Sequence, residues 1–211
     1  MKKYVQYGCG HSAPLQWINF DISPTLRVQK TPVVGSLLKG RLNTTFAPNV
    51  RHGDIVKGLP VADNSCDGVY CSHILDNLSL EDLPLALKNS YKILKKGGIF
   101  RCVIPDLEYE ARTYIQNLDR GDKSASIKFL HDTQLGFVKR PRGFTGMMLS
   151  LFSNRRHLWM WDAHSLGEQL KLAGFQEIRP CKRHDSQDEM FKLVENDAGR
   201  FSNAVAFECI K

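Results

Sequence analysis

The feature that most constrains the fold is a short strand that runs directly into closely spaced glycines. Residues 4–10 read Tyr-Val-Gln-Tyr-Gly-Cys-Gly, so strand-forming side chains pass at once into a Gly-x-Gly turn. Glycine accepts a positive φ and lets a ligand approach the main chain closely. This pattern is typical of the first strand of a doubly wound α/β domain, where the turn opens a cofactor crevice.

A second strand is predicted over residues 17–21, and it ends in the carboxylate of Asp21. An acidic side chain at this position can accept hydrogen bonds from ribose hydroxyls. The alternative is a tight turn followed by an exposed aspartate.

Length and composition fit one ordinary globular domain spanning residues 1–211. The N-terminus lacks the apolar region of a signal peptide, and no stretch approaches the ~20 apolar residues of a membrane span. The six cysteines are scattered without metal-ligand spacing. We therefore expect a reducing, cytoplasmic location, no disulfides and no bound metal. The net charge of +7 permits an anionic partner without requiring one.

The remaining pattern alternates strands with helices, which favours a mostly parallel sheet with right-handed crossovers. Strands are predicted at 2–7, 17–21, 50–55, 67–73, 99–104, 175–180 and 202–210. Helices are predicted at 79–96, ending at Gly97-Gly98, and at 106–118, 122–135 and 162–173, with weaker helical patterns at 33–42 and 190–194. Only six residues, 11–16, separate the first glycine turn from the second strand, so the first helix must be vestigial.

Residues 107–161 lie between the fifth and sixth predicted strands. This segment is basic and aromatic, and residues 147–152 read as an apolar core. Such a surface could bind an anionic, ring-bearing molecule or nucleic acid, although it could equally be a solvated basic face. The candidate binding residues are Arg140, Arg142, Arg155, Arg156 and Trp159.

Taken in order, these segments resemble the class I S-adenosylmethionine-dependent methyltransferases of the type 11 kind. The resemblance is closest to a branch of small methyltransferases linked to surface-polysaccharide pathways. It implies a Rossmann-like α/β fold with a doubly wound, mostly parallel seven-stranded sheet and S-adenosylmethionine as cofactor. The segments that carry it are 4–10, 19–21, 53–55, 59–60, 67–69, 72–75, 94–100 and 170–175.

The resemblance also implies roles for particular residues. The glycine turn would pass under the methionine part of the cofactor, Asp21 would hold the ribose, and Asp54 would accept from the adenine amino group. Ser72 and His73 would border the sulfonium and the acceptor. Residues 107–161 would form a helical cap, inserted between the fifth and sixth strands, that binds the acceptor. The full set of implied cofactor-binding residues is Tyr7, Gly8, Cys9, Gly10, Asp21, Ile22, Asp54, Ile55, Ser72 and His73.

His73 is the first candidate for a general base, since the pKa of histidine suits that role and the residue follows the fourth strand. Asp106 is the second candidate, although a role as a helix N-cap would also explain it. His131 and His157 are weaker candidates. Two departures stand against full activity: the first helix is cut short, and Asp76-Asn77 replaces the Glu-His pair of many relatives.

The leading functional hypothesis is methyl transfer to a small or glycan-linked acceptor, including a phosphorylated one. One alternative is a catalytically silent binding protein of the same fold. A nucleic-acid methyltransferase is a further alternative that we do not favour. A nicotinamide-dependent oxidoreductase is disfavoured, because no helix of proper length follows the glycine turn. The sequence leaves the oligomeric state open.

Overall fold

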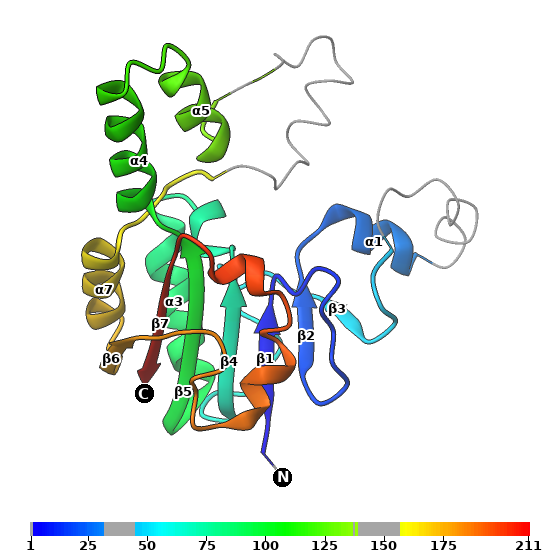
Figure 1. Cartoon of the computed structure of the whole chain (residues 1–211). Coiled ribbons are helices and arrows are strands. Elements are labelled where there is room, and N and C mark those ends of the chain that lie inside the picture. The colour runs from blue at the N-terminus through cyan, green and yellow to red at the C-terminus, as the bar shows by residue number, and fades with distance from the viewer. Residues whose placement is uncertain (1, 32–44, 137, 139–156) are drawn as a thin grey trace.

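The core of the molecule is one seven-stranded sheet with the strand order β3-β2-β1-β4-β5-β7-β6 (Figure 1). The computed structural model describes residues 2–31, 45–136, 138 and 157–211. The strands are β1 Tyr4–Tyr7, β2 Ile18–Asp21, β3 Val50–His52, β4 Cys66–Ser72, β5 Leu94–Pro105, β6 Gln176–Pro180 and β7 Ala204–Ile210.

Strand direction divides the sheet into a parallel part and an antiparallel edge. The neighbouring pairs from β3 to β5 are parallel, whereas β7 runs antiparallel to both β5 and β6. Chain reversal on either side of β1 places the carboxyl ends of β1 and β4 beside each other, which creates a crevice at a topological switch point. The predicted doubly wound α/β fold is therefore confirmed.

Helices cover one face of this sheet and also extend beyond it. The helices are α1 Pro24–Lys30, α3 Asp82–Ile93, α4 Leu107–Asp119, α5 Ala125–Asp132 and α7 Ala163–Leu172. The 3₁₀ turns are η1 Leu75–Asn77, η2 Glu189–Leu193 and η3 Ala198–Phe201. Leu83 and Leu87 of α3 and Leu166 of α7 pack into one buried cluster with inward residues of β1, β4 and β5.

A polar turn takes the place of the first helix, as predicted. Residues 11–16 contain only turns and irregular backbone. The buried side chain of Gln6 donates to the Ser12 carbonyl and to Asn19 Oδ1, and Asn19 donates in turn to the Pro14 carbonyl (2.7, 2.5 and 3.0 Å). These bonds satisfy the backbone of the turn but bury little apolar surface.

The face of the sheet left bare by this short connection is covered by residues 181–203, which join β6 to β7. Phe191 of η2 and Val194 pack with Trp17 and Tyr70 in a second buried cluster. The indole N–H of Trp17 donates to the Met190 carbonyl (3.1 Å). Figure 1 shows this orange and red segment in front of β1 and β4, opposite α3. A late part of the chain thus replaces the missing first layer of helix.

One predicted helix differs from the structure, and one observed helix was not predicted. The helix predicted at 79–96 ends at Ile93, because Leu94 pairs with Cys66 and begins the long strand β5. Lys95 accordingly lies on a strand, where its ammonium pairs with Asp67 (2.9 Å). The short helix α1, with Pro24 in its first turn, was not predicted, whereas the pattern at 33–42 falls outside the described residues.

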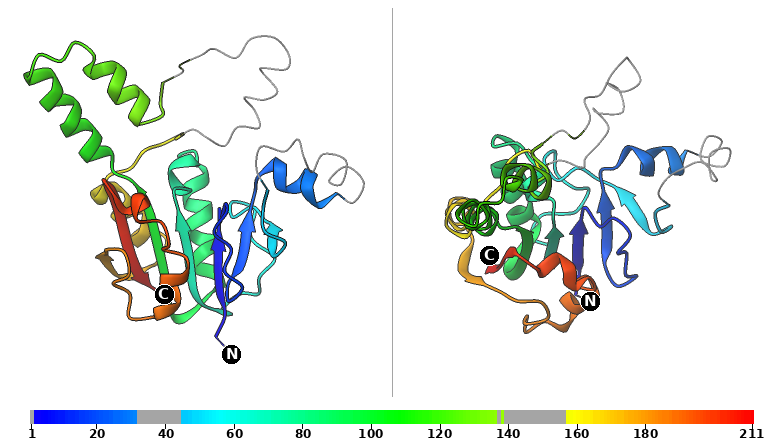
Figure 2. Two further views of the ribbon diagram at one scale, coloured as in Figure 1. Left: turned by 45° about the vertical axis from the view of Figure 1, so that its right-hand side comes forward. Right: turned by 45° about the horizontal axis from the view of Figure 1, so that its top comes forward.

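The described part of the cap is a pair of helices, α4 and α5, that projects past the carboxyl ends of the strands (Figure 2). Asp106 caps α4 as predicted, and Asp162 forms a capping box with Ser165 at the start of α7. The predicted apolar stripe of α4 is only half covered: Ile115 is 53% exposed, and Tyr114 packs on Phe129 at a ring distance of 5.3 Å. The predicted cap core, 147–152, lies outside the described residues.

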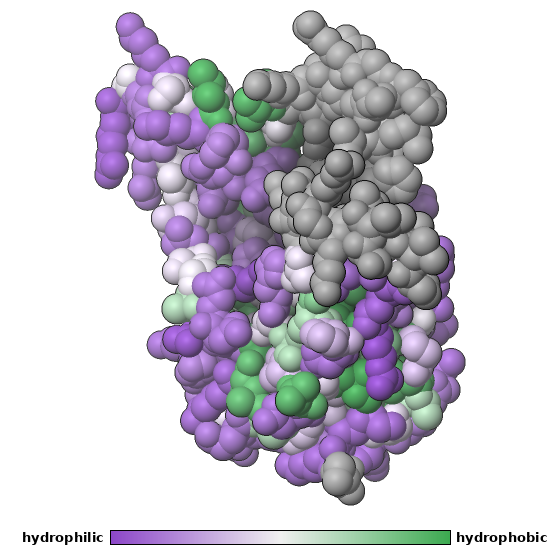
Figure 3. Space-filling view, turned by 90° about the vertical axis from the view of Figure 1, so that its right-hand side faces the viewer, coloured by the Kyte–Doolittle hydropathy of each residue, from purple (hydrophilic) through white to green (hydrophobic). Residues whose placement is uncertain are grey.

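The outer surface is mainly hydrophilic on the side seen in Figure 3, where hydrophobic residues form small groups. Within the described ranges, no helix combines the length and the apolar character needed to cross a bilayer.

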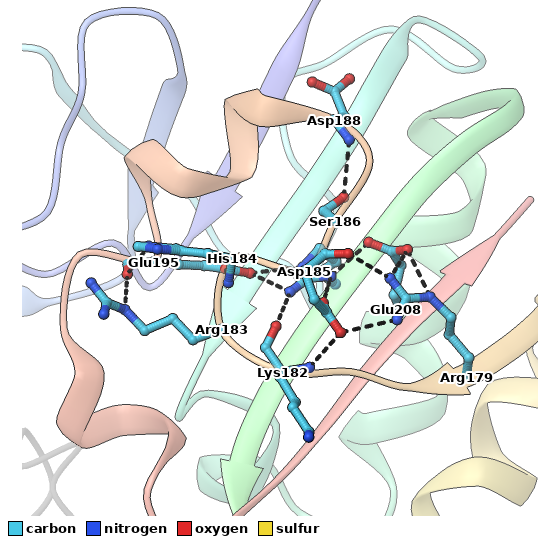
Figure 4. Close-up of polar contacts among 10 residues, drawn as sticks. Arg179, Lys182, Arg183, His184, Asp185, Ser186, Asp188, Glu195 and Glu208 are labelled. Carbon is cyan, nitrogen blue, oxygen red and sulfur yellow. Dashed lines mark hydrogen bonds and ion pairs between the residues drawn. The ribbon is translucent and has the colours of Figure 1, made fainter.

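A buried arginine, Arg101, joins the covering segment to the centre of the sheet. Figure 4 labels its carboxylate partners Asp185, Glu195 and Glu208. Arg101 of β5 is 0% exposed. Its guanidinium donates to Glu195 Oε1 (2.7 Å), Glu208 Oε2 (2.6 Å) and Asp185 Oδ1 (3.0 Å). Arg179 supplies a second cation from the surface, 2.6 Å from Glu208. The ion pairs therefore link β5, β7 and the loop that covers them.

We predict that Arg101→Met lowers the free energy of unfolding by about 3–5 kcal/mol, because it leaves buried carboxylates without their cation. Arg179→Ala is the matched control. Its side chain is 42% exposed, so its removal should cost about 1 kcal/mol or less. Urea denaturation of both variants measures the difference, and equal losses would contradict the central role of Arg101.

Candidate functional site

Two adjoining cavities open at the carboxyl ends of the central strands. The larger has a volume of about 490 Å³ and the smaller about 310 Å³. Tyr7, Gly8, Ser72 and Arg200 line both cavities, so they form one two-lobed crevice with its waist at β1 and β4. Each lobe has the size of a small-molecule site.

The larger lobe gathers most of the predicted cofactor residues. They come from the ends of four neighbouring parallel strands, where the sheet geometry brings them together. The predicted residues in its lining are Tyr7, Gly8, Asp21, Ile22, Asp54, Ile55, Ser72 and His73. Cys9 and Gly10 line the smaller lobe instead.

The two glycines of the turn differ in what surrounds the position where a Cβ would lie. Both have a positive φ, +63° at Gly8 and +53° at Gly10. A Cβ at Gly8 would collide with the side chain of Ile74, so this glycine is required by protein packing. A Cβ at Gly10 would meet nothing within 4 Å. Of these two glycines, Gly10 is the one with open space where a Cβ would lie, and it lines the smaller lobe.

Asp21 joins the glycine turn to the segment after β2. Its carboxylate is 9% exposed and accepts from the backbone N–H of Gly10 (3.0 Å) and of Ser23 (2.8 Å). Each carboxylate oxygen still has lone-pair capacity for a further donor. Asp21 thus holds the turn in place and offers acceptors to a bound hydroxyl.

Asp54 and two isoleucines line the outer part of the larger lobe. Asp54 Oδ1 accepts from the backbone N–H of Val56 (3.0 Å), and its second oxygen lies 3.7 Å from the ammonium of Lys57. Ile22 is 40% exposed beside the lobe, whereas Ile55 is buried. An apolar surface next to a carboxylate suits a flat ring that carries an amino group.

His73 lies where β4 ends and has a left-handed backbone, with φ of +55°. This uncommon conformation for a side chain larger than glycine is held by neighbours. Its N–H donates to the Val103 carbonyl (2.7 Å), and its carbonyl accepts from Asn77 Nδ2 (2.8 Å). Burial lowers the pKa of the His73 imidazole, so the neutral form predominates at pH 7. Neutral imidazole is the form required of a general base.

Asp76 is not one of the residues that line the crevice. It contacts residues 157–159, at the end of the cap segment. Its carboxylate is fully buried and lies 3.0 Å from His157 Nε2. The other ring nitrogen, Nδ1, donates to the Thr133 carbonyl (2.9 Å). The Asp76 carbonyl accepts from the N–H groups of Leu158 and Trp159 (2.9 and 3.2 Å). This Asp76–His157 clasp ties η1, the end of α5 and the cap return together.

Burial lowers the pKa of His157, but the adjacent Asp76 carboxylate outweighs burial, so the pKa is raised overall. Both ring nitrogens face oxygen atoms, which favours the imidazolium form. The pair Asp76-Asn77, which stands where many relatives have Glu-His, therefore has a structural role. Asp76 binds His157 at the end of the cap, and Asn77 donates a hydrogen bond to the backbone carbonyl of His73.

The smaller lobe contains a residue that the sequence did not reveal. Arg200 of η3 donates from Nη1 to the Ser72 carbonyl (3.2 Å), at the waist of the crevice. Asp197 and Asn196 line the same wall. Burial raises the pKa of Cys9 to about 12, so its thiol stays protonated at neutral pH. No motif marks Arg200, since it reaches the crevice only through the path of residues 181–203.

The other predicted residues lie elsewhere. Asp106 accepts from the Glu108 N–H (2.9 Å) as the cap of α4 and does not line either lobe. Trp159 is 45% exposed, with its ring 6.2 Å from that of Trp161. Within the described ranges, no group of three or more acidic, histidine or cysteine side chains is arranged to hold a metal. Arg140, Arg142, Arg155 and Arg156 fall outside the described residues.

Comparisons with known proteins agree with this geometry. Residues 5–102 match a family model described as "Methyltransferase domain". The curated protein "Probable methyltransferase ltbC" of Aspergillus luteorubrus is 44% identical over 48 residues, which are 22% of this chain and 17% of that protein. The match thus spans less than a fifth of that relative.

Solved structures show the same fold at low sequence identity. An S-adenosylmethionine-dependent methyltransferase of Thermotoga maritima aligns with 100% of this chain and 83% of its own, at 19% identity and a TM-score of 0.52. A second S-adenosylmethionine-dependent methyltransferase, from Archaeoglobus fulgidus, aligns with 100% of this chain and 86% of its own, at 16% identity and a TM-score of 0.50. At these identities the similarity shows the fold alone.

We predict that the Asp76–His157 clasp stabilises the fold at low pH more than at high pH. Because the pKa of folded His157 is raised, the stabilisation is full below the unfolded pKa of about 6.5 and is lost as pH rises through the folded pKa. His157→Gln should lower the free energy of unfolding by about 1–3 kcal/mol near pH 6. Chemical denaturation from pH 5.5 to 9 tests this, and a deficit that grows with pH would contradict the ion pair.

Proposed function

We propose that the chain is a class I S-adenosylmethionine-dependent methyltransferase, which transfers a methyl group from that donor to a small or glycan-linked acceptor. One observation carries the proposal. The ends of β1, β2, β3 and β4 bring the glycine turn, Asp21, Asp54 and His73 into one crevice of about 490 Å³. The donor would supply a methyl group on a positively charged sulfur.

The lining of the larger lobe fits an adenosine group. Asp21 would accept from the ribose hydroxyls with the lone pairs that Gly10 and Ser23 leave free. Asp54 would accept from the adenine amino group, with Ile22 and Ile55 against the ring. The Asp21 and Asp54 carboxylates in the lining would also favour a cationic sulfur electrostatically.

Most of the acceleration would come from alignment, since methyl transfer is an in-line displacement. A base is needed only where the acceptor carries its proton at neutral pH. His73 is the residue we propose for that role, because it lines the crevice and stays neutral. Asp106 caps α4 outside the lining, so its predicted catalytic role has less support than that of His73.

The acceptor would enter beside His73, where Asn77, Leu78 and Asp82 complete the lining of the larger lobe. A concave lobe of this size suits a small molecule or one sugar unit better than a nucleic-acid duplex. The predicted acceptor contacts at Arg140, Arg142, Arg155, Arg156 and Trp159 remain predictions. A phosphorylated acceptor would suit those basic residues.

The catalytically silent alternative is separated from the enzyme by a single measurement. Isothermal titration calorimetry with S-adenosylmethionine and S-adenosylhomocysteine should give saturable binding of both. If the protein binds neither ligand, the proposal that it is an enzyme is wrong. We place the activity in the cytoplasm, because all six cysteines are free thiols, as expected in a reducing compartment.

We predict that Asp21→Ala weakens binding of S-adenosylhomocysteine by about 1–3 kcal/mol, because the ribose loses charge-assisted hydrogen bonds. Asp63→Ala is the matched control: Asp63 is half exposed and, within the described part of the chain, forms an ion pair with Lys92 alone. Calorimetry measures both dissociation constants. An unchanged constant in a folded Asp21→Ala protein would disprove the assignment.

We predict that His73→Asn lowers kcat by about 10²–10⁴-fold for an acceptor that carries a proton, with donor affinity nearly unchanged. Asparagine tolerates the left-handed backbone at this position. The acceptor would first be found by incubating labelled donor with a cell extract. Because the pKa of His73 is lowered in the free protein, wild-type kcat/KM should rise with pH, with its half-maximal point below about pH 6.5. An identical acid limb in the variant would exclude His73 as the base.

A further inference from the structure

The smaller lobe is closed by residues that lie far outside the segment matched by the family model. Val194, Asn196, Asp197 and Arg200 form one wall, and the glycine turn forms the other. Asn196 Nδ2 donates to Ser12 Oγ across the lobe (3.2 Å). The match covers residues 5–102, so it assigns nothing to this wall.

The wall carries one charge of each sign close to the glycine turn. Arg200 Nε lies 3.6 Å from Asp197 Oδ2, and Asp197 Oδ1 accepts from the Gly199 N–H (2.9 Å). The Arg200 side chain is 45% exposed and uses Nη1 on the Ser72 carbonyl. Among the residues that the structure describes, the other N–H groups of the guanidinium have no hydrogen-bond partner, so they can donate to a ligand in this lobe. Gly10 presents open space on the facing side.

A cationic and an anionic side chain that lie close together suit a zwitterionic ligand. An α-amino acid carries a carboxylate, which suits a guanidinium, and an ammonium, which suits a carboxylate. The methyl donor has such an end, joined through its sulfur to the adenosine. The two lobes meet at Gly8 and Ser72, so a ligand with adenosine in the larger lobe can extend its other end into the smaller one.

We propose that residues 194–200 bind the amino-acid end of the methyl donor, with Arg200 on its carboxylate and Asp197 on its ammonium. This inference rests on the proposed function and adds a wall to the donor site. The donor would therefore be held by both ends of the chain: Gly8 and Asp21 near the N-terminus, and Arg200 near the C-terminus.

The test compares two ligands that differ in the amino-acid end. S-adenosylhomocysteine carries it, whereas 5′-methylthioadenosine lacks it. Arg200→Gln should weaken S-adenosylhomocysteine binding at least tenfold and change 5′-methylthioadenosine binding less than twofold. Asp197→Asn, which keeps the cap of η3, should act in the same direction. Lys192→Ala is the control, because Lys192 pairs with Glu189 alone among the described residues and lines neither lobe.

Each outcome separates this inference from the proposed function. If wild-type protein binds neither ligand, the proposed function fails and this inference fails with it. If Arg200→Gln weakens both ligands equally, or weakens neither, the proposed function stands and the amino-acid site is wrong. An effect confined to the KM of an anionic acceptor would assign Arg200 to the acceptor instead. Unfolding temperatures of the variants identify any loss that reflects misfolding.

Discussion

A charge buried in the middle of a sheet has to be neutralised, and Arg101 imposes that requirement on this fold. A guanidinium at 0% exposure is tolerated only with close, well-directed acceptors. Its carboxylate partners come from residues 185, 195 and 208, all late in the chain. The β6–β7 connection is therefore fixed against β5 by electrostatics as well as by the packing of Phe191, whose ring centre lies 5.6 Å from the guanidinium.

That fixed connection explains how a sheet without a first helix keeps a usable site. The short turn at 11–16 leaves Tyr4, Trp17 and Tyr70 on one face without a helix to cover them. The β6–β7 connection buries these side chains and continues to Arg200 at the waist of the crevice. Cover for the core and a wall for the site thus come from the same segment.

The strands and the larger lobe were predictable because they depend on local signals. Strand-forming runs end in Gly8, Asp21 and His73, and parallel strands bring such ends to one edge. The end of α3 was mispredicted because Lys95 and Gly97 resemble the end of a helix. In the structure α3 ends at Ile93, because Leu94 pairs with Cys66 of β4 and begins strand β5. Arg200 could not be found, since its place depends on tertiary packing across the sheet. The clasp between Asp76 and His157 was missed for the same reason.

The position of β7 between β5 and β6 has a consequence for how the chain is made. Ribosomes release the N-terminal residues first, so 5–102 emerge while β7 is still unsynthesised. Until then β6 has no neighbour in the sheet, one face remains open to water, and Arg101 lacks Glu195 and Glu208. The nascent chain would expose apolar surface that chaperones recognise, and the crevice could be completed only after residues 194–200 have been synthesised. Vectorial synthesis therefore delays completion of the site even though its glycine turn emerges first.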